Sequence, residues 1–466
     1  MANLERLFSP RTVAVIGASG NPGKLGCHVM KSLTQGGFRG EIIPVNPASG
    51  DIMGLKSYPS IRAFSGPIDL AVVVVPAKLV PGVFGECAEK GVRGIVLITA
   101  GFKEIEDPVG ADLHEEILAI ARRAGIPVIG PNTFGMINFA PVINASFTPE
   151  FSWIRPGNIA LVSQSGGMAH LLGFLAQRGD VGLSKIVGLG NRLNVDFPEM
   201  LAYLMDDPHT KVIALYVEGI DRARDLLHAA RTCGGRKPLI AYKTGAAGVG
   251  DVASRSHTGS MAGRGEIYDG AFSQAGILSV QGSEALLDGA RALSLCPLVG
   301  GPGIAVLTAQ AGPGMAASDL CEREGLRIAS FSRRTQEQIN ACLPPLALRS
   351  NPVDMGPAWY DSGAIGKIVK AVMKEERIHG ILLLTMFASA NVEILKGLAA
   401  ILKDWGQKKP IISCISAPPG IWDEQIRDLE ESGALVNYPT PERAAAAMAV
   451  LWRYRRLMEK FDTDKK

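Results

Sequence analysis

The chain has no marked excess of charge of either sign. Its 466 residues include 48 Lys and Arg against 45 Asp and Glu, which gives a formal net charge of +3. Proteins that bind nucleic acid through its phosphates need a dense basic surface, whereas the basic residues here are scattered along the sequence. The composition therefore argues against nucleic acid as a partner.

Long apolar runs and paired cysteines are also missing. No stretch approaches the roughly 20 apolar residues that a membrane-spanning helix requires, and charged residues precede the first expected strand, where a signal peptide would be apolar. The seven cysteines show no C-x-x-C pair or regular spacing, which argues against a disulfide framework or a zinc site. These features predict a cytoplasmic protein without a membrane span and without a metal site.

Apolar, β-branched runs instead alternate with helical patterns almost from end to end, as is typical of α/β proteins. Strands buried on both faces, as parallel sheets require, explain runs that are apolar throughout. The expected strands form three series: 12–16, 41–45, 69–75, 94–98 and 126–129; 158–162, 186–189, 211–217, 238–242 and 277–280; 304–308, 327–330, 380–384, 410–414 and 434–436.

Segments rich in Gly and Pro at 155–157 and 296–303 separate these series. The sequence thus predicts three doubly wound parallel-sheet domains, at residues 1–150, 151–298 and 299–466. In such sheets, ligands bind beyond the carboxyl ends of the strands. Candidate functional residues are therefore expected in the turns that follow the strands.

The turn after the first strand is rich in glycine. Glycines recur there at a spacing of three, at Gly17, Gly20, Gly23 and Gly26. They allow a phosphate to approach the backbone, and the helix that follows offers free N–H groups. The spacing is not G-x-G-x-x-G, and Asn46-Pro47 ends the second strand in place of an acidic residue, so a nicotinamide cofactor is disfavoured. A ligand such as CoA fits better, and a purely structural turn is the alternative.

The second series offers an anion site and a carboxylate. The sequence S-Q-S-G-G at 163–167 ends its first strand and precedes a helix, which favours phosphate binding over ordinary capping. The pattern is not G-x-S-x-G, so a hydrolase nucleophile at Ser165 is disfavoured. Glu218 closes the strand 211–217 and can hold an imidazole ring by one nitrogen, although a solvated acid at a strand end is the alternative.

His257 lies in the small polar run S-R-S-H-T-G-S at 254–260. Imidazole is a neutral nucleophile near pH 7 without special tuning, and a loop of Ser, Thr and Gly lets a large anion approach. A surface or packing histidine is the alternative. The third series repeats the strand-to-turn pattern at 308–315 and has a compact turn at 351–354, which are best explained as structural turns.

Taken together, the motifs resemble those of the α subunits of NDP-forming acyl-CoA synthetases, in the succinyl-CoA synthetase superfamily, and most of all the ADP-forming acetyl-CoA synthetases. The likeness covers nearly the whole chain, and the order and spacing of the motifs make it specific. The motifs are V-A-V-I-G-A-S at 13–19, P-G-K at 22–24, P-V-N-P at 44–47, V-P-A at 75–77, T-A-G-F at 99–102, G-P-N at 130–132, S-Q-S-G at 163–166, E-G at 218–219, S-H-T-G at 256–259 and N-P-V-D at 351–354.

The resemblance implies a Rossmann-like CoA-binding domain followed by two flavodoxin-like domains. It implies that His257 is phosphorylated, that Glu218 holds it, and that acyl-CoA, phosphate and ADP are reversibly converted to acid, CoA and ATP through an acyl phosphate. Phosphate would be bound by Ser165, Gly166 and Gly167. CoA would be bound by Ser19, Pro22, Lys24, Leu25, Asn46, Val75, Pro76, Thr99, Ala100 and Asn132.

The nucleotide site of such enzymes lies in an ATP-grasp domain, for which three α/β domains leave no room. The resemblance therefore implies a separate β subunit that carries ADP or ATP and Mg²⁺, in an α2β2 assembly. Ala48 replaces a frequent Lys, and A-Q-A at 309–311 replaces a turn richer in Asn and Gly. The acyl pocket is expected near Ser165 and the segment 132–147, shaped by Thr133, Phe134, Asn144 and Phe147.

Two other functions remain as alternatives. A CoA-binding or acyl-CoA-binding regulatory protein without turnover of its own would need neither His257 nor Glu218, so the presence of both favours the enzyme. A nicotinamide-dependent oxidoreductase is the weaker alternative, because the first glycine-rich turn lacks the usual fingerprint.

Overall fold

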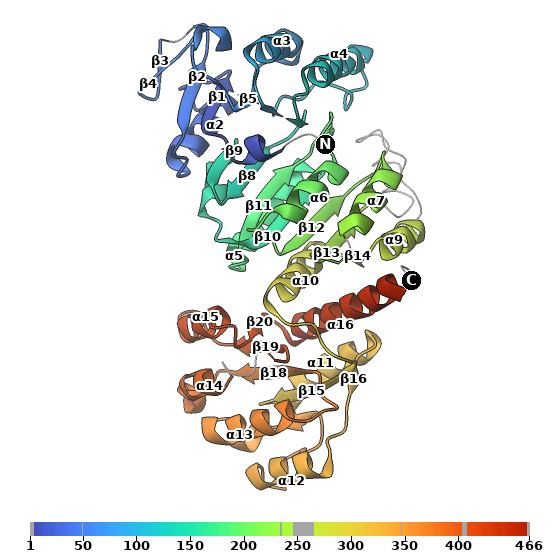
Figure 1. The fold of residues 1–466 in the computed structure, drawn as a ribbon. Helices are drawn as coiled ribbons and strands as arrows, with labels where there is room; N and C mark the ends of the chain where they lie inside the picture. The colour runs from blue at the N-terminus through green and yellow to red at the C-terminus, as the bar shows by residue number, and fades with distance from the viewer. Residues whose placement is uncertain are drawn as a thin grey trace. The chain divides into compact units, whose positions relative to one another are not determined.

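The computed structural model describes residues 4–48, 50–233, 235–245, 265–345, 347–402 and 408–463. His257 lies outside these described residues. The chain divides into two compact units, residues 1–283 and 284–466 (Figure 1). Each unit is described by itself below.

The first unit contains a five-stranded parallel sheet near its N-terminus. Across the sheet the strands are β2 (Glu41–Val45), β1 (Thr12–Ile16), β5 (Leu70–Val73), β6 (Gly94–Leu97) and β7 (Val128–Ile129). The helices and small elements around it are α1 (Glu5–Phe8), α2 (Leu25–Gln35), α3 (Val80–Lys90), α4 (Pro108–Ala124), η1 (Ile61–Ala63), η2 (Ala77–Leu79) and the pair β3 (Asp51–Ile52) and β4 (Leu55–Lys56).

Both faces of this sheet are buried. Alternate residues of β1 belong to different cores: Val13 and Val15 pack with α2, and Ala14 and Ile16 pack with α3 and α4. Side chains of a strand point alternately to its two faces, so a strand covered on both sides must be apolar throughout. This explains why the runs that predicted the strands show no polar alternation.

The second sheet of the first unit has seven strands. Across the sheet they are β14 (Ile277–Val280), β13 (Leu239–Lys243), β12 (Val212–Val217), β10 (Pro156–Ser163), β11 (Leu183–Gly188), β8 (Gly135–Phe139) and β9 (Val142–Ser146). The core against one face includes residues of α6 (Phe197–Asp206), α7 (Ala223–Cys233) and α9 (Gly265–Gln274). The helix α5 (Gly166–Arg178) packs against β10 and β11, and η3 (Pro149–Trp153) packs against α5.

Five of these seven strands are parallel, while β8 and β9 pair antiparallel. The expected division near residue 150 falls after β9, yet β8 pairs with β11 of this second sheet. The segment 135–146 thus joins the sheet that follows it in the sequence. Neither of these two strands was predicted.

The second unit holds a six-stranded parallel sheet. Its strands are β15 (Gly303–Thr308), β16 (Arg327–Ile328), β17 (Val353–Asp354), β18 (Gly380–Met386), β19 (Ile411–Ser416) and β20 (Val436–Asn437). Its helices are α10 (Ser283–Leu295), α11 (Ala311–Arg323), α12 (Arg333–Cys342), α13 (Ser362–Met373), α14 (Ile394–Leu402), α15 (Asp423–Glu431) and α16 (Pro441–Thr463), with the short η4 (Gly356–Ala358) and η5 (Ser389–Asn391).

In this unit α11 and α16 pack against the sheet and against each other (Figure 1). A large hydrophobic core that includes sheet residues contains residues of α12, α13, α14 and α15. Helices on both faces of mostly parallel sheets confirm the predicted α/β fold class.

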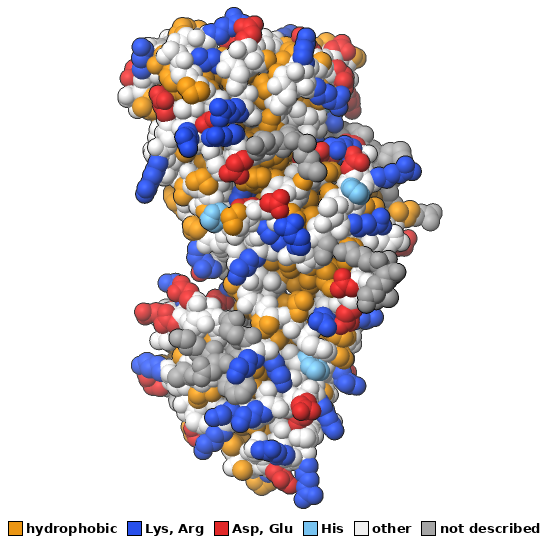
Figure 2. Space-filling model, viewed as in Figure 1, with side chains coloured by type: hydrophobic (Ala, Val, Ile, Leu, Met, Phe, Trp, Pro, Cys, Tyr) orange, Lys and Arg blue, Asp and Glu red, His pale blue; other side chains and the backbone are white. Residues whose placement is uncertain are grey.

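The described residues include no helix with both the length and the apolar character needed to cross a bilayer. All seven cysteines are free thiols. Figure 2 shows Lys and Arg side chains interspersed with Asp and Glu on the face it presents. This distribution agrees with the scattered charges of the sequence.

Candidate functional site

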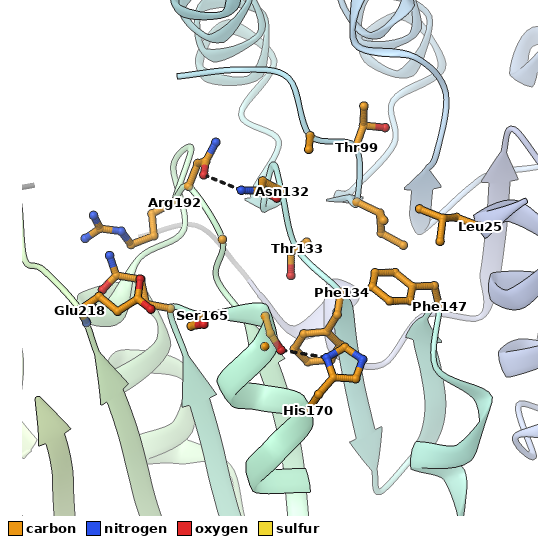
Figure 3. Close-up of a pocket in the computed structure, with 17 residues that line it drawn as sticks. Leu25, Thr99, Asn132, Thr133, Phe134, Phe147, Ser165, His170, Arg192 and Glu218 are labelled. Atoms are coloured by element: carbon orange, nitrogen blue, oxygen red, sulfur yellow. Dashed lines mark hydrogen bonds between the residues drawn. The ribbon is translucent and has the colours of Figure 1, made fainter. Parts of the chain in front are cut away.

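A cavity of about 640 Å³ opens in the first unit, at the carboxyl ends of its strands (Figure 3). This volume is within the usual range for small-molecule sites. Its walls come from the start of α2, the turns after β6 and β7, the residue after β9, the turn after β10, the first turns of α5, and the turns after β11 and β12. The lining residues are Leu25, Ile98–Ala100, Asn132–Phe134, Phe147, Gln164–Gly167, His170, Gly190–Arg192 and Glu218.

The N-terminus of α5 forms one wall of the cavity. Ser165 caps the helix, because its Oγ accepts a hydrogen bond of 3.3 Å from the N–H of Met168. The hydroxyl of Ser163 donates to the carbonyl of Ser165 at 2.7 Å and fixes the turn. Gly166 and Gly167 begin the helix, where N–H groups have no intrahelical acceptor. Together with the helix dipole, these groups make an anion-binding site.

The two glycines leave open space beside these N–H groups. A Cβ atom at Gly166 or at Gly167 would meet nothing closer than 4.0 Å. Packing of the chain therefore does not require glycine at either position. The open space suits a phosphate-sized ligand, which a side chain would obstruct.

If phosphate binds at this helix start, as the sequence predicts, Gly166→Ala should raise the KM for phosphate about tenfold, since its methyl group would obstruct a hydrogen bond to a charged group, which is worth about 1.5–3 kcal/mol. The same change should raise the free energy of unfolding by about 0.4–1 kcal/mol, because alanine restricts the unfolded chain. Steady-state kinetics with varied phosphate and chemical denaturation measure the two effects. Gly270→Ala on α9, where a Cβ also meets nothing within 4 Å, should stabilise the chain and leave KM unchanged. An unchanged KM in Gly166→Ala would contradict the assignment.

Glu218 follows β12 and lies in a braced turn. The N–H groups of Glu218 and Gly219 both donate to Oε1 of Gln164, at 2.9 and 3.0 Å. From the other side, Arg192 donates to the carbonyl of Gly219 at 3.2 Å and to Asp221 at 2.8 Å. The backbone that carries the Glu218 carboxylate is thus held in place beside the α5 N-terminus.

The side chain of Arg192 is buried and also lies 3.6 Å from the carboxylate of Asp196. Burial raises the pKa of Asp196 above its usual value, although Arg192 opposes the shift. A buried cation with carboxylates on two sides is costly to separate from them. It makes this end of the cavity polar and ordered.

A polar network connects the loops after β6, β7 and β11. Glu104 accepts hydrogen bonds from the backbone N–H groups of Gly101 at 2.5 Å and Phe102 at 3.2 Å, and from the side chain of Asn191. Asn132 lies beside Asn191 in the cavity, and its Nδ2 is 3.5 Å from the Oδ1 of Asn191 (Figure 3). The backbone N–H of Asn132 donates to the carbonyl of Thr99 at 2.9 Å. The network therefore ties the first sheet's loops to those of the second.

The opposite end of the cavity is apolar. Figure 3 shows Leu25 and Phe147 across the cavity from Arg192 and Glu218. His170 packs against Phe134 and Phe147, with ring centroids 5.4 and 5.7 Å away. Apolar and aromatic walls suit a hydrocarbon group.

His170 is held through both of its ring nitrogens. Its Nδ1 donates to the carbonyl of Gly166 at 2.8 Å, and its Nε2 is 2.8 Å from the hydroxyl of Thr148. A carbonyl can only accept, so in the neutral ring the proton is on Nδ1 and Nε2 accepts from Thr148. Neither nitrogen is available as a nucleophile. This histidine therefore shapes the cavity and is not itself a candidate nucleophile.

Comparison with known proteins decides the family. The family model described as a CoA binding domain matches residues 11–138, and that of the succinyl-CoA ligase-like flavodoxin domain matches residues 156–293. The α subunit of acetate–CoA ligase (ADP-forming) II from Pyrococcus furiosus is 36% identical over 96% of this chain and 97% of its own length. The chain belongs to the family of ADP-forming acetate–CoA ligase α subunits.

A solved structure in this family has the same fold throughout. It is that of acetyl-coenzyme A synthetase 1 from Ca. Korarchaeum cryptofilum, described as dinucleotide forming and in complex with phosphate and ADP. It matches with a TM-score of 0.91 and 34% identity over 100% of this chain and 99% of that chain. The acetate–CoA ligase (ADP-forming) I from Archaeoglobus fulgidus is 37% identical over 98% of this chain, which spans 64% of the length of that relative.

The structure brings together eight of the residues that the family resemblance singled out. They line the cavity: Leu25, Thr99, Ala100, Asn132, Ser165, Gly166, Gly167 and Glu218. Of the residues expected to shape an acyl pocket, Thr133, Phe134 and Phe147 also line it. Asn144 does not, because its amide is buried and donates to Thr148 and Ser152.

The remaining residues expected to bind CoA lie on neighbouring turns outside this cavity. They are Ser19, Pro22, Lys24, Asn46, Val75 and Pro76. The Nδ2 of Asn46 donates to the carbonyl of Ala18 at 2.8 Å, which joins the turns after β2 and β1. The hydroxyl of Thr99 donates to the carbonyl of Val75 at 2.7 Å, which joins those after β6 and β5. These turns therefore form one continuous edge.

The glycines of the first turn have structural reasons of their own. Gly17 has φ +94°, a conformation that other residues rarely adopt, and a Cβ at Gly26 would lie 2.0 Å from the carbonyl oxygen of Gly17. The helix α2 therefore begins very close to the end of β1. Lys24, at the N-cap of α2, is exposed.

Sequence reasoning missed Gln164, Asn191, Arg192, His170 and Glu104. Gln164 lies within the S-Q-S-G-G motif, but its role depends on Glu218, more than 50 residues later. Arg192 and Asn191 follow a strand, which is the one signal that points to them. Their roles arise from contacts that only the folded chain creates.

Proposed function

We propose that this chain is the α subunit of an NDP-forming acid:CoA ligase. It converts acyl-CoA, ADP and phosphate reversibly to acid, ATP and CoA. One observation carries the proposal: a single cavity is lined by the anion-binding start of α5, by Glu218 and by the turn after β6 in the CoA-binding domain. Such a cavity holds a thioester beside a phosphate, which the first reaction step needs.

In the first step, an oxygen of HPO₄²⁻ attacks the thioester carbon, and CoA leaves as a thiol that takes up the phosphate proton. The acyl phosphate remains at Ser165, Gly166 and Gly167. A ring nitrogen of His257 then attacks phosphorus, and the acid leaves as a carboxylate. Finally the phosphoryl group passes from His257 to ADP. Positioned N–H groups and a nucleophile suffice for such transfers.

Glu218 serves this second step by accepting a hydrogen bond from the other ring nitrogen of His257. The carboxylate orients the ring and stabilises the positive charge that develops on it. The hydrogen bonds from Gln164 and Arg192 support this role, because they hold the backbone that carries the Glu218 carboxylate, which can then orient a histidine with little rearrangement.

CoA binds along the edge formed by the turns after β1, β2, β5 and β6. Ser19, Pro22, Lys24 and Leu25 contact it from the first turn, Asn46 from the second, Val75 and Pro76 from the third, and Thr99, Ala100 and Asn132 near the thiol end. The match of the CoA-binding family model to residues 11–138 supports this placement. We assign residues 1–150 to CoA binding, 151–298 to phosphate and His257 chemistry, and 299–466 to a third flavodoxin-like domain.

ADP or ATP and Mg²⁺ bind to a β subunit with an ATP-grasp domain, in an α2β2 assembly. The Pyrococcus furiosus relative is named as a subunit α. In the longer Archaeoglobus fulgidus relative, this chain accounts for 64% of the length. The remainder of that relative is long enough for the nucleotide-binding part, which supports a partner that carries it.

The acyl group occupies the apolar end of the cavity, against Leu25, Phe134 and Phe147. Arg192 supplies the cationic side chain among the described lining residues, and it lies across the cavity from Leu25 and Phe147 (Figure 3). A second carboxylate on the substrate would therefore be buried against apolar walls, which is costly. We propose monocarboxylic acids with apolar chains as substrates, in preference to dicarboxylic acids.

The chain reconstituted with its β subunit tests the function. We expect ATP-dependent formation of CoA thioesters from acetate, isobutyrate or phenylacetate, and little from succinate, in an assay of free thiol consumed. Labelled ATP should leave an acid-labile phosphate on this chain that His257→Asn lacks. CoA binding without label or thioester formation would support the regulatory protein, and tight NADH binding without CoA binding would support the oxidoreductase. Either result would overturn the ligase.

A further inference from the structure

Gln164 is fixed at the edge of the cavity and is 5% exposed. Its backbone N–H donates to the carbonyl of Tyr216 at 3.1 Å, which holds the residue between β10 and β12. Its Oε1 accepts from the N–H groups of Glu218 and Gly219. Gln164 is thus held both by its backbone N–H and by its side-chain oxygen.

These contacts also fix which way the amide points. A reversed amide would place the NH₂ group against two N–H donors, so the oxygen must face Glu218 and Gly219. The Nε2 of Gln164 has no hydrogen-bond partner among the described residues. This NH₂ group is not sealed inside the protein, so its donors are left for water or for a ligand in the cavity. A ligand acceptor in the cavity that Gln164 lines would provide that partner.

We propose that Gln164 is a catalytic residue whose Nε2 donates a hydrogen bond to the acyl carbonyl oxygen of the thioester. This inference rests on the ligase function proposed above. When phosphate attacks the thioester carbon, the electron pair of the C=O bond moves to oxygen and creates an oxyanion. The pair returns to re-form C=O as the C–S bond breaks, and the thiolate takes the phosphate proton.

A neutral, pre-positioned amide suits this oxygen. It stabilises the charge that develops in the transition state and needs no rearrangement. The phosphate has separate donors in the N–H groups of Gly166 and Gly167 at the start of α5. The cavity therefore offers one donor set for each of the two reacting groups.

Arsenolysis isolates this step, because arsenate attacks acetyl-CoA in place of phosphate and the acyl arsenate hydrolyses without His257 or nucleotide. Gln164→Glu keeps an oxygen that accepts from the N–H groups of Glu218 and Gly219, which favour the ionised carboxylate, but it loses the NH₂ donor. Gln164→Met loses both the acceptor oxygen and the NH₂ donor, and it adds no charge. In both variants of the reconstituted enzyme, the kcat for thiol release should fall about 10²-fold, the usual effect of one oxyanion donor.

Two further measurements separate the possible causes. Labelling of His257 by ATP uses no acyl group and should stay at the wild-type rate in both variants, which also shows that they are folded and assembled. Gln177→Glu makes the same change at the opposite end of α5 and should leave kcat unchanged.

Three outcomes would overturn the inference or its basis. A wild-type kcat in Gln164→Glu would show that the oxygen alone matters and that Gln164 only positions Glu218. A wild-type kcat in Gln164→Met, with a low kcat in Gln164→Glu, would assign the effect to the added charge. Absence of arsenolysis in the wild type would instead overturn the proposed function itself.

Discussion

Replacing Glu218 with glutamine should lower the rate at which acyl phosphate phosphorylates His257 by about 10⁴-fold, the loss seen when a carboxylate that orients a catalytic histidine becomes an amide. Glutamine has nearly the same shape, but it carries no charge to stabilise the imidazolium, and its NH₂ group favours the wrong tautomer. The backbone of the turn should stay in place, because Gln164 and Arg192 hold Glu218 and Gly219 through main-chain atoms. Rapid-quench labelling with acetyl phosphate measures the effect.

The same variant should accept phosphate from ATP at the wild-type rate, because the β subunit would perform that step. Glu150→Gln, at an exposed position in η3 of the same unit, should affect neither reaction. If Glu218→Gln slowed both reactions equally, Glu218 would support the chain's structure or its assembly, and its assignment to His257 would be wrong.

The sequence predicted the site wherever the chemistry follows from strand order. Ser165 and Glu218 were expected at one edge because each follows a buried parallel strand, and carboxyl ends of parallel strands meet at the same edge. β10 and β12 are direct neighbours, with Leu161 opposite Ala214. The two residues therefore line one cavity. Their detailed roles remain predictions.

The residues that sequence reasoning missed act through distant partners. Gln164 accepts from Glu218 and Gly219, and Arg192 donates to Gly219 and Asp221. Each pair is separated by more than 25 residues, and no local pattern encodes such a contact. The same limit applies to the pairing of β8 with the distant strand β11, whereas β8 and β9 form a local hairpin.

A buried lysine explains another difference between prediction and structure. The expected strand began at residue 186, after Lys185, whereas β11 begins at Leu183 and contains Lys185 with no exposed side-chain area. Its Nζ lies 2.6 Å from the carboxylate of Asp207. A buried charge is tolerated when it is paired, and the partner comes from a distant turn. Local hydrophobicity therefore placed the start of the strand too late.

Asp207→Asn should consequently lower the free energy of unfolding of the first unit by about 3–5 kcal/mol, because it leaves the ammonium group of Lys185 buried without its counter-charge. The amide oxygen can still accept from the N–H of His209, which Oδ1 of Asp207 binds at 3.3 Å, and the NH₂ group that replaces Oδ2 can donate to the hydroxyl of Thr210, which lies 2.5 Å from Oδ2. The loss therefore reports on the ion pair. Amide hydrogen exchange of β11, followed by mass spectrometry in increasing denaturant, measures it.

Two further variants test whether the lost ion pair causes the loss of stability in Asp207→Asn. Asp206→Asn is the same substitution one residue earlier, in an exposed pair with Arg236 at 3.0 Å, and should cost no more than about 1 kcal/mol. Adding Lys185→Met to Asp207→Asn should recover most of the loss, since no buried charge remains. If the double variant were as unstable as Asp207→Asn alone, the loss would come from packing and the ion-pair explanation would be wrong.

The dependence on pH gives an independent check. Burial acts to raise the pKa of Asp207, but hydrogen bonds from Lys185 and Thr210 outweigh it and hold the pKa below its usual value. The carboxylate of Asp207 therefore stabilises the folded chain above about pH 4, and this contribution is lost as pH falls through the folded pKa. Asp207→Asn has no such group to protonate. The stability difference between wild type and variant should thus be largest near neutral pH and narrow in acid, whereas a packing defect would keep it constant.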